Sequence, residues 1–279
     1  RDRSVSRGLG DVYKRQNDDN ALEMYTLQCH NHILKPLAEK YGIDTSDEAI
    51  RAAVEQHNEV CRLIRAIGDF RKEANPRVTG YEFHILTLVS YVAPKHLIVD
   101  KLRETLEEIK TREPDAADKY RARVVFVGSE VDDVDVIRLV EESGAYVCAD
   151  RFCYGSLPGR DEIILNDEED VVKQVCRQVQ GRAQCPRYWD MAKMTGRRDY
   201  VADLAKEYGA DGIIYEQMKF CDPWAYERMI GTIVLRDEHG YPVLAVDRPY
   251  SIGSSGQMRT RVQAFVESIE IKKIQGGKK

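Results

Sequence analysis

The chain has 279 residues, of which 43% are hydrophobic, and its 42 basic and 47 acidic side chains give a net charge of −5. This length suffices for one large domain or two medium-sized ones, and the charge gives no reason to expect a nucleic acid or a membrane surface as a partner. No apolar run approaches the roughly 18 residues that a membrane span requires. The chain has seven cysteines, an odd number, and it is too long to need disulfides for stability. Both facts favour reduced thiols in the cytoplasm over a disulfide framework.

The first segment, residues 1–16, differs from the rest of the chain in composition and has no helical or strand periodicity. We expect it to be a non-native scar, resembling translated adapter sequence. The native gene would then continue upstream, and the chain would be a fragment. The prediction of the fold therefore begins at residue 17.

Residues 17–121 have the periodicity of helices. Capping residues at 44–46 precede apolar residues that recur at helical spacing as far as Ile67, and Pro76 ends that segment. Two further helical segments follow, one over residues 81–92 and one that Pro94 opens. The first third of the chain is therefore predicted to be a helical region.

From residue 122 to residue 275 the period changes. Short apolar or β-branched runs alternate with amphipathic helical segments, a pattern typical of parallel βαβ units. We therefore predict an α/β chain, in which the amino-terminal helical region is followed by a doubly wound, mostly parallel sheet of flavodoxin or Rossmann type. The predicted strands cover residues 124–127, 146–149, 212–215 and 243–246.

Two cysteines, Cys153 and Cys221, fall in loops that follow predicted strands, and ligands of such sheets bind at the carboxyl ends of the strands. Asp222 and Pro223 suit the N-cap and first position of a helix, so the Cys221 thiol is expected just before a helix N-terminus. The helix dipole and the nearby Lys219 would favour the thiolate, which is the form that binds metal. No Cys-x-x-Cys pair is present, so spacing alone leaves an incidental loop cysteine as the alternative.

A small-residue loop at 251–256 leads into another predicted helix. Free backbone amides at a helix start bind anions, and small residues allow close approach. A tight turn with capping serines is the alternative, and neither a P-loop nor a dinucleotide fingerprint is present. The candidate contacts for a phosphate, a cluster sulfide or a partner's carboxylate are Ser254, Ser255, Gly256 and Gln257.

Several motifs together carry a family resemblance. The most specific are Lys-Phe-Cys-Asp at residues 219–222 and Gly-Gln-Met-Arg-Thr-Arg-Val-Gln-Ala-Phe at residues 256–265, supported by the stretches 123–130, 149–155 and 240–249. With these motifs, the sequence from about residue 22 to residue 274 resembles the D-component family of 2-hydroxyacyl-CoA dehydratases, which also contains benzoyl-CoA reductase subunits.

The resemblance implies a 4Fe–4S cluster held by three cysteines in each of two related subunits. Cys221 matches the third ligand in chain order, and Cys153 matches a residue common in the family and is our second choice. The first two ligands lie in an amino-terminal α/β domain that we expect to be missing here, because Cys29 and Cys61 do not match them. The amides of residues 254–257 would contact the cluster or an anion.

The resemblance also implies a cytoplasmic, anaerobic enzyme. An ATP-dependent iron–sulfur activator protein would supply one electron, and the clusters would pass it to the thioester of an acyl-CoA, whose radical then loses water. The alternatives are a benzoyl-CoA reductase-type subunit, a non-catalytic structural or electron-relay partner in the same heterodimer, and a metal-free α/β nucleotide- or CoA-binding module. The sequence does not distinguish the acyl group, or dehydration from ring reduction.

Overall fold

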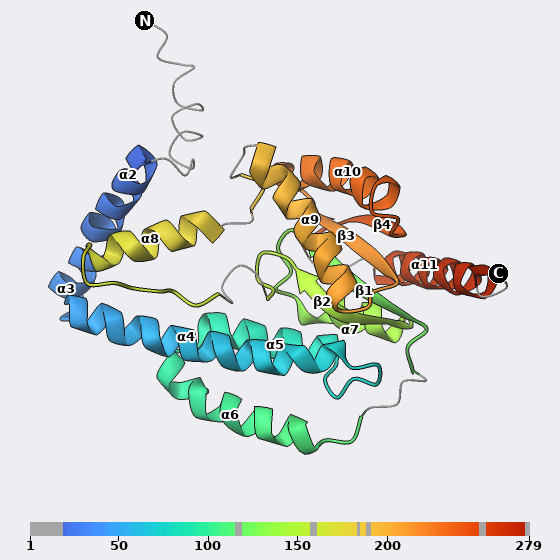
Figure 1. Cartoon of the computed structure of the whole chain (residues 1–279), viewed down its shortest axis with the longest axis horizontal. Coiled ribbons are helices and arrows are strands. Elements are labelled where there is room, and N and C mark those ends of the chain that lie inside the picture. The colour runs from blue at the N-terminus through green and yellow to red at the C-terminus, as the bar shows by residue number, and fades with distance from the viewer. Residues whose placement is uncertain are drawn as a thin grey trace, which may run out of the picture.

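The computed structural model describes residues 19–114, 119–156, 161–182, 185–187, 191–250 and 255–276. It confirms the predicted fold class, because an amino-terminal helical region leads into a parallel sheet with flanking helices (Figure 1). The segment 1–16 lies outside the described residues. None of the helices within these ranges is long and apolar enough to cross a bilayer.

The helical region is organised by local capping and one apolar core. Ser46 caps the longest helix by accepting a hydrogen bond from the Ala49 amide, and Thr79 and Glu82 form a reciprocal capping box at the start of another helix. Val60, Ile64 and Phe83 are among the buried residues that join these helices. The elements are α2 (Asp19–Cys29), the π-helix η1 (His30–Leu34), α3 (Lys35–Tyr41), α4 (Asp47–Asp69), the 3₁₀ turn η2 (Phe70–Lys72), α5 (Gly80–Val92) and α6 (Lys95–Thr111).

The sheet contains four parallel strands in the order β2-β1-β3-β4. Its strands are β1 (Ala122–Gly128), β2 (Ala145–Arg151), β3 (Gly212–Met218) and β4 (Val243–Arg248). Alternate side chains of β1 point to opposite faces, and all four from Val124 to Val127 are fully buried. Burial on both faces explains why these strands are continuous apolar runs.

Helices cover both faces of the sheet, as expected for a doubly wound fold. α7 (Val134–Glu142) and α11 (Ser255–Gly276) pack over the side chains of Val124 and Phe126. α9 (Met191–Glu207) and α10 (Asp222–Asp237) pack over Val125 and Val127. α8 (Val171–Arg182) instead packs against α2 and α4 of the helical region.

The helical region is fixed to the sheet through α5 and η2. The carboxylate of Glu141 in α7 accepts hydrogen bonds from the amides of Gly80 and Tyr81, at 2.8 and 3.1 Å, and so satisfies the free N-terminus of α5. Close packing continues at Val147, because a Cβ on Gly80 would lie 2.6 Å from the Val147 Cβ. These contacts place the helical region beside β2 and leave the carboxyl edge of the sheet to the loops.

Candidate metal centre

The carboxyl edge of the sheet includes, between β1 and β3, the position at which open α/β sheets form a ligand-binding crevice. The chain moves from β1 to β2 on one side and then continues to β3 and β4 on the other, so the strand order reverses between β1 and β3. Loops that leave two neighbouring strands in opposite directions open such a crevice, and ligands of open α/β sheets bind there. The loops after β1 and β3 contain Ser129 and Cys221.

Ser129 links three of the loops at this edge. Its hydroxyl donates to the Glu216 carboxylate at 2.9 Å and accepts a hydrogen bond from the Met218 amide at 2.6 Å. Its carbonyl accepts from the Cys153 amide at 3.0 Å. The loops that contain Cys153 and Cys221 are therefore both tied to the end of β1.

Glu216 lies beneath this network and is fully buried. Its carboxylate lies 2.9 Å from Nε of Arg248, which is also buried, and the backbone amide of Ser129 donates to it at 3.1 Å. Burial is the largest influence on this carboxyl group and raises its pKa from the ordinary value of 4.5 to about 7, although Arg248 and Ser129 act in the opposite direction. An acid of this kind changes charge near neutral pH.

Replacing Glu216 with glutamine is expected to reduce the pH dependence of stability. Because folding raises this pKa, its contribution is fully present below pH 4.5 and is lost as the pH rises to about 7. The free energy of unfolding, measured with urea at about pH 5 and about pH 8, should fall by about 2–3 kcal/mol more in the wild type than in Glu216→Gln. Glu141, whose pKa burial also raises to about 7, titrates in both proteins and cancels in the comparison. Equal pH dependence in the two proteins would contradict this assignment.

Cys221 is the N-cap residue of α10, and Pro223 lies in the first turn. The sequence predicted Asp222 as the cap, so the helix begins one residue earlier than expected. The backbone amide of Trp224 and the nearby Arg187 lower the pKa of the Cys221 thiol, but burial is the larger effect and the pKa stays above its ordinary value. We expected a thiolate from the sequence, whereas burial favours the protonated thiol. A metal ion would have to displace this proton on binding.

The turn before Cys221 has a strained backbone. Phe220 has a φ of 72°, a left-handed conformation that is rare for a bulky residue, and its side chain is 97% exposed. Hydrogen bonds on both sides hold the turn, from the Lys219 amide to the Arg248 carbonyl at 2.8 Å and from the Cys221 amide to the Met218 carbonyl at 3.1 Å. Strain of this kind concentrates at functional sites, where the surrounding structure maintains it.

Three thiols approach this edge of the sheet. Cys153 is half-buried and packs against the same apolar cluster as Cys221. Burial raises the pKa of Cys153 to about 11, with further contributions from Cys185 and Cys221, so the three thiols lie within electrostatic range of one another. Sequence reasoning missed Cys185, because it follows none of the predicted strands.

Thiols are suitable ligands for iron, but this group is not a complete site as it stands. Within the described residues, no group of three or more histidine, cysteine, aspartate or glutamate side chains is placed to hold a metal ion. The donor chemistry at this edge therefore fits an iron–sulfur cluster, while the arrangement requires further ligands or a rearrangement of these loops.

The predicted anion-binding segment is only partly described. Ser254 lies outside the described residues, and the side chain of Ser255 is not described; Gly256 and Gln257 are exposed at the start of α11. The two arginines in the first turns of this helix are engaged elsewhere. Arg259 pairs with Glu142 at 2.9 Å, and Arg261 donates to the Ala245 carbonyl at 2.7 Å. Anion binding here therefore depends on the backbone amides and stays a prediction.

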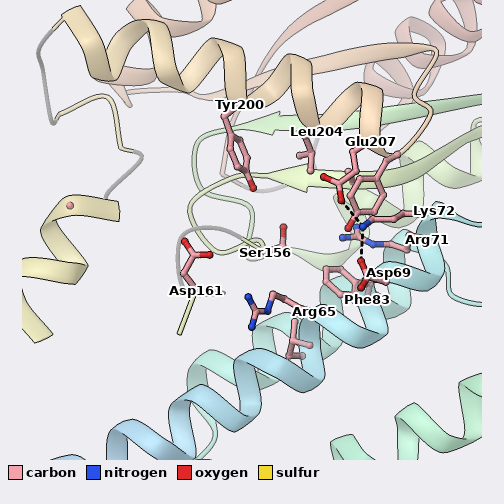
Figure 2. A pocket seen from close by; sticks show the side chains of 15 residues that line it. Arg65, Asp69, Arg71, Lys72, Phe83, Ser156, Asp161, Tyr200, Leu204 and Glu207 are labelled. Atoms are coloured by element: carbon pink, nitrogen blue, oxygen red, sulfur yellow. Dashed lines mark ion pairs between the residues drawn. The ribbon is translucent and has the colours of Figure 1, made fainter. Parts of the chain in front are cut away.

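A cavity of about 630 Å³ lies between α4, η2 and α9, beside the end of β2 (Figure 2). Tyr200 and Phe83 supply apolar surface, and three cations reach its wall. Each of these cations is matched by carboxylates at 2.5–2.9 Å, so the described residues of the wall leave no surplus positive charge for a phosphate. The pairs are Arg65 with Glu162, Arg71 with Asp150, and Lys72 with Asp69 and Glu207.

Comparison with known proteins places these features in a family. Residues 12–269 match the family model for the 2-hydroxyglutaryl-CoA dehydratase D-component, and this match begins inside the segment 1–16. The chain is 25% identical over 230 residues to the (R)-phenyllactyl-CoA dehydratase beta subunit of Clostridium sporogenes. The aligned residues cover 82% of this chain and 59% of that protein. It is 25% identical over 260 residues to the beta subunit of the (R)-2-hydroxyglutaryl-CoA dehydratase of Acidaminococcus fermentans, with coverages of 91% and 66%.

A reductase subunit has a sequence identity to this chain close to that of the dehydratase subunits. One of the benzoyl-CoA reductase subunits of Thauera aromatica is 23% identical over 266 residues, which cover 94% of this chain and 67% of that protein. The chain thus spans about three fifths to two thirds of the length of these relatives.

Proposed function

Because the chain belongs to the 2-hydroxyglutaryl-CoA dehydratase D-component family, we propose that it is part of one subunit of an iron–sulfur 2-hydroxyacyl-CoA dehydratase. The observation that carries this proposal is the position of Cys221. It lies at the reversal of strand order, at the N-cap of α10, with a second thiol on the neighbouring loop tied to the same serine. An incidental core cysteine has no reason to combine these features.

In this proposal Cys221 is one ligand of a 4Fe–4S cluster, and Cys153 is the second choice. When bound, such a cluster supplies one-electron transfer to the thioester of an acyl-CoA. The residues of this chain hold and shield it. Ser129 fixes the two cysteine-bearing loops, and the amide of Trp224, which favours the Cys221 thiolate, would stabilise the ligand form of the sulfur.

Two partners follow from this proposal: a related second subunit and an ATP-dependent iron–sulfur activator. The further ligands that the described residues do not supply would come from polypeptide outside them. A benzoyl-CoA reductase-type role is the second candidate, favoured by the match of 94% of this chain to a subunit of that enzyme. A structural or electron-relay subunit is compatible with the same cysteine geometry.

Replacing Cys221 with serine is expected to remove one cluster. The chain, extended by the upstream coding sequence recovered from its gene, would be expressed without oxygen together with a related second subunit. Iron and acid-labile sulfide would be measured on the purified complex. Cys221→Ser should lose about four iron atoms per chain, because a cluster proposed to be held by three cysteines would be left with two. Near-ultraviolet circular dichroism of the complex would check that it still folds.

Cys153→Ser is the matched control, since it removes a thiol from the neighbouring loop at the same edge. Retained iron in this variant, with loss in Cys221→Ser, would support the ligand assignment. Cys185→Ser, measured in parallel, would show whether the third thiol takes part. Iron unchanged in every variant would exclude a cluster held by this chain and leave the structural or metal-free functions.

A further inference from the structure

A second pair of thiols lies far from the candidate metal centre. Sγ of Cys176 is 3.6 Å from Sγ of Cys29. Cys29 is the last residue of α2, and Cys176 lies in the middle of α8, 147 positions later in the sequence. Figure 1 shows α2 and α8 side by side at the end of the molecule opposite the sheet.

Packing holds the two thiols against each other. Leu22, Val172 and Cys176 form a small buried cluster, against which Cys29 and Leu34 pack. Polar contacts close the junction at the surface: Lys173 pairs with Glu23, and Nε2 of His30 lies 3.5 Å from Asp170. The approach of the two sulfurs is thus a consequence of how α8 seats on α2.

The local backbone allows the small movement that a bond would require. A disulfide has its sulfurs about 2.0 Å apart, so the two atoms must move together by roughly 1.5 Å. Cys29 stands at the junction of α2 with the π-helix η1 (His30–Leu34), where the helical hydrogen bonds change register. Such π segments are rare and occur frequently at functional sites. A change of side-chain rotamer at this junction would bring the sulfur of Cys29 toward Cys176.

We propose that Cys29 and Cys176 form a site of reversible disulfide exchange with low-molecular-weight disulfides. Cys29 is the more exposed of the two, so its thiolate attacks one sulfur of the small disulfide and releases the first thiol. The Cys176 thiol then loses its proton to solvent and attacks the Cys29 sulfur, which releases the second thiol. Two cysteine thiols are oxidised to one disulfide, and the small disulfide is reduced to two thiols.

The second step requires the thiolate of Cys176, so its rate depends on pH. In the reduced protein burial is the largest cause of a raised pKa of Cys176; Cys29 and Asp170 act in the same direction and Thr26 opposes them. The contribution of Cys29 ends once its thiol is part of the mixed disulfide, whereas burial still favours the protonated Cys176 thiol. Closure of the bond should therefore accelerate as the pH rises. Once formed, the bond fastens α8 to α2 and joins the part of the chain that precedes the sheet to the part between β2 and β3. This inference does not rest on the proposed function, because neither cysteine is assigned to the metal centre.

The test is peptide mapping of the whole chain after incubation with glutathione disulfide under anaerobic conditions. We expect the intact mass to fall by about 2 Da, for two hydrogens, and the Cys29 peptide to be recovered joined to the Cys176 peptide. Dithiothreitol should restore the two free peptides. This measurement uses the wild type, so it does not depend on the folding of any variant.

Variants then assign the pair. Cys29→Ser and Cys176→Ser should each abolish the cross-link, whereas Cys61→Ser should leave it intact. Cys61 is a matched control, because it is a buried cysteine on a helix whose Sγ lies 3.4 Å from a ring nitrogen of His57 instead of another thiol. The proposal would be overturned by an unchanged mass in the wild type, or by cross-links among Cys153, Cys185 and Cys221 with Cys29 and Cys176 still free.

Discussion

Replacing Arg71 with methionine is expected to lower the free energy of unfolding by about 3–5 kcal/mol. Arg71 lies in η2 and its Nη1 donates to Asp150 at the end of β2 at 2.9 Å, with both side chains almost fully buried. Its guanidinium also stacks on the Phe83 ring at 3.6 Å. Methionine keeps much of the volume but leaves the Asp150 carboxylate buried without its cation. Urea denaturation of the wild type and the variant would measure the loss.

Arg65→Met is the matched control, because it removes an arginine from the preceding helix that pairs with Glu162 at 2.7 Å while 45% exposed. Solvent screening limits such a pair to under about 1 kcal/mol. Combining Arg71→Met with Asp150→Asn should recover part of the loss, since no unpaired charge then stays buried. If Arg71→Met costs no more than Arg65→Met, the buried pair does not fasten the helical region to the sheet.

The strands could be predicted from the sequence because each one crosses an apolar core. The predicted runs 124–127, 146–149, 212–215 and 243–246 all lie within observed strands. Their order could not be predicted, because pairing between β1 and β3 depends on contacts between residues about ninety positions apart. Local periodicity carries no information on such pairing.

The strands also extend beyond the apolar runs, and the extensions supply much of the site. β2 continues through Asp150 and Arg151, β3 through Glu216, and β4 through Arg248, all of which are buried. A charged residue after an apolar run is typical of the start of a loop, since isolated charges are rarely buried. Here each of the pairs Arg71–Asp150 and Arg248–Glu216 brings together segments distant in sequence, so no local signal could have revealed them.

Cys153 and Cys221 could be placed at the carboxyl edge from the sequence, because each follows a strong strand signal. Cys185 could not, since it lies between α8 and α9 and follows none of the predicted strands. The same limit applies to Cys29 and Cys176, because their pairing depends on how α8 packs against α2 and has no counterpart in local spacing.

Gly128→Ala is expected to cost about 1–3 kcal/mol of stability and to disturb the Cys221 loop. A Cβ at this position would lie 2.3 Å from the Glu216 carbonyl oxygen and 2.6 Å from its carboxylate. The clash is with backbone, so β1 and β3 must separate where Gly128 pairs with Glu216, and the bonds from Ser129 to Glu216 and Met218 would lengthen. Faster alkylation of Cys221 than in the wild type, measured by mass spectrometry, would report the loosened loop.

Gly196→Ala separates this effect from the general effect of adding a methyl group to a glycine. Gly196 lies inside α9, and a Cβ there meets no atom within 4 Å, so alanine should stabilise the helix by up to about 1 kcal/mol. Opposite signs for the two substitutions would show that the approach of β1 to Glu216 excludes a side chain. If Gly128→Ala leaves both the stability and the alkylation rate of Cys221 unchanged, then the contact between β1 and β3 does not position the loop that carries the proposed ligand.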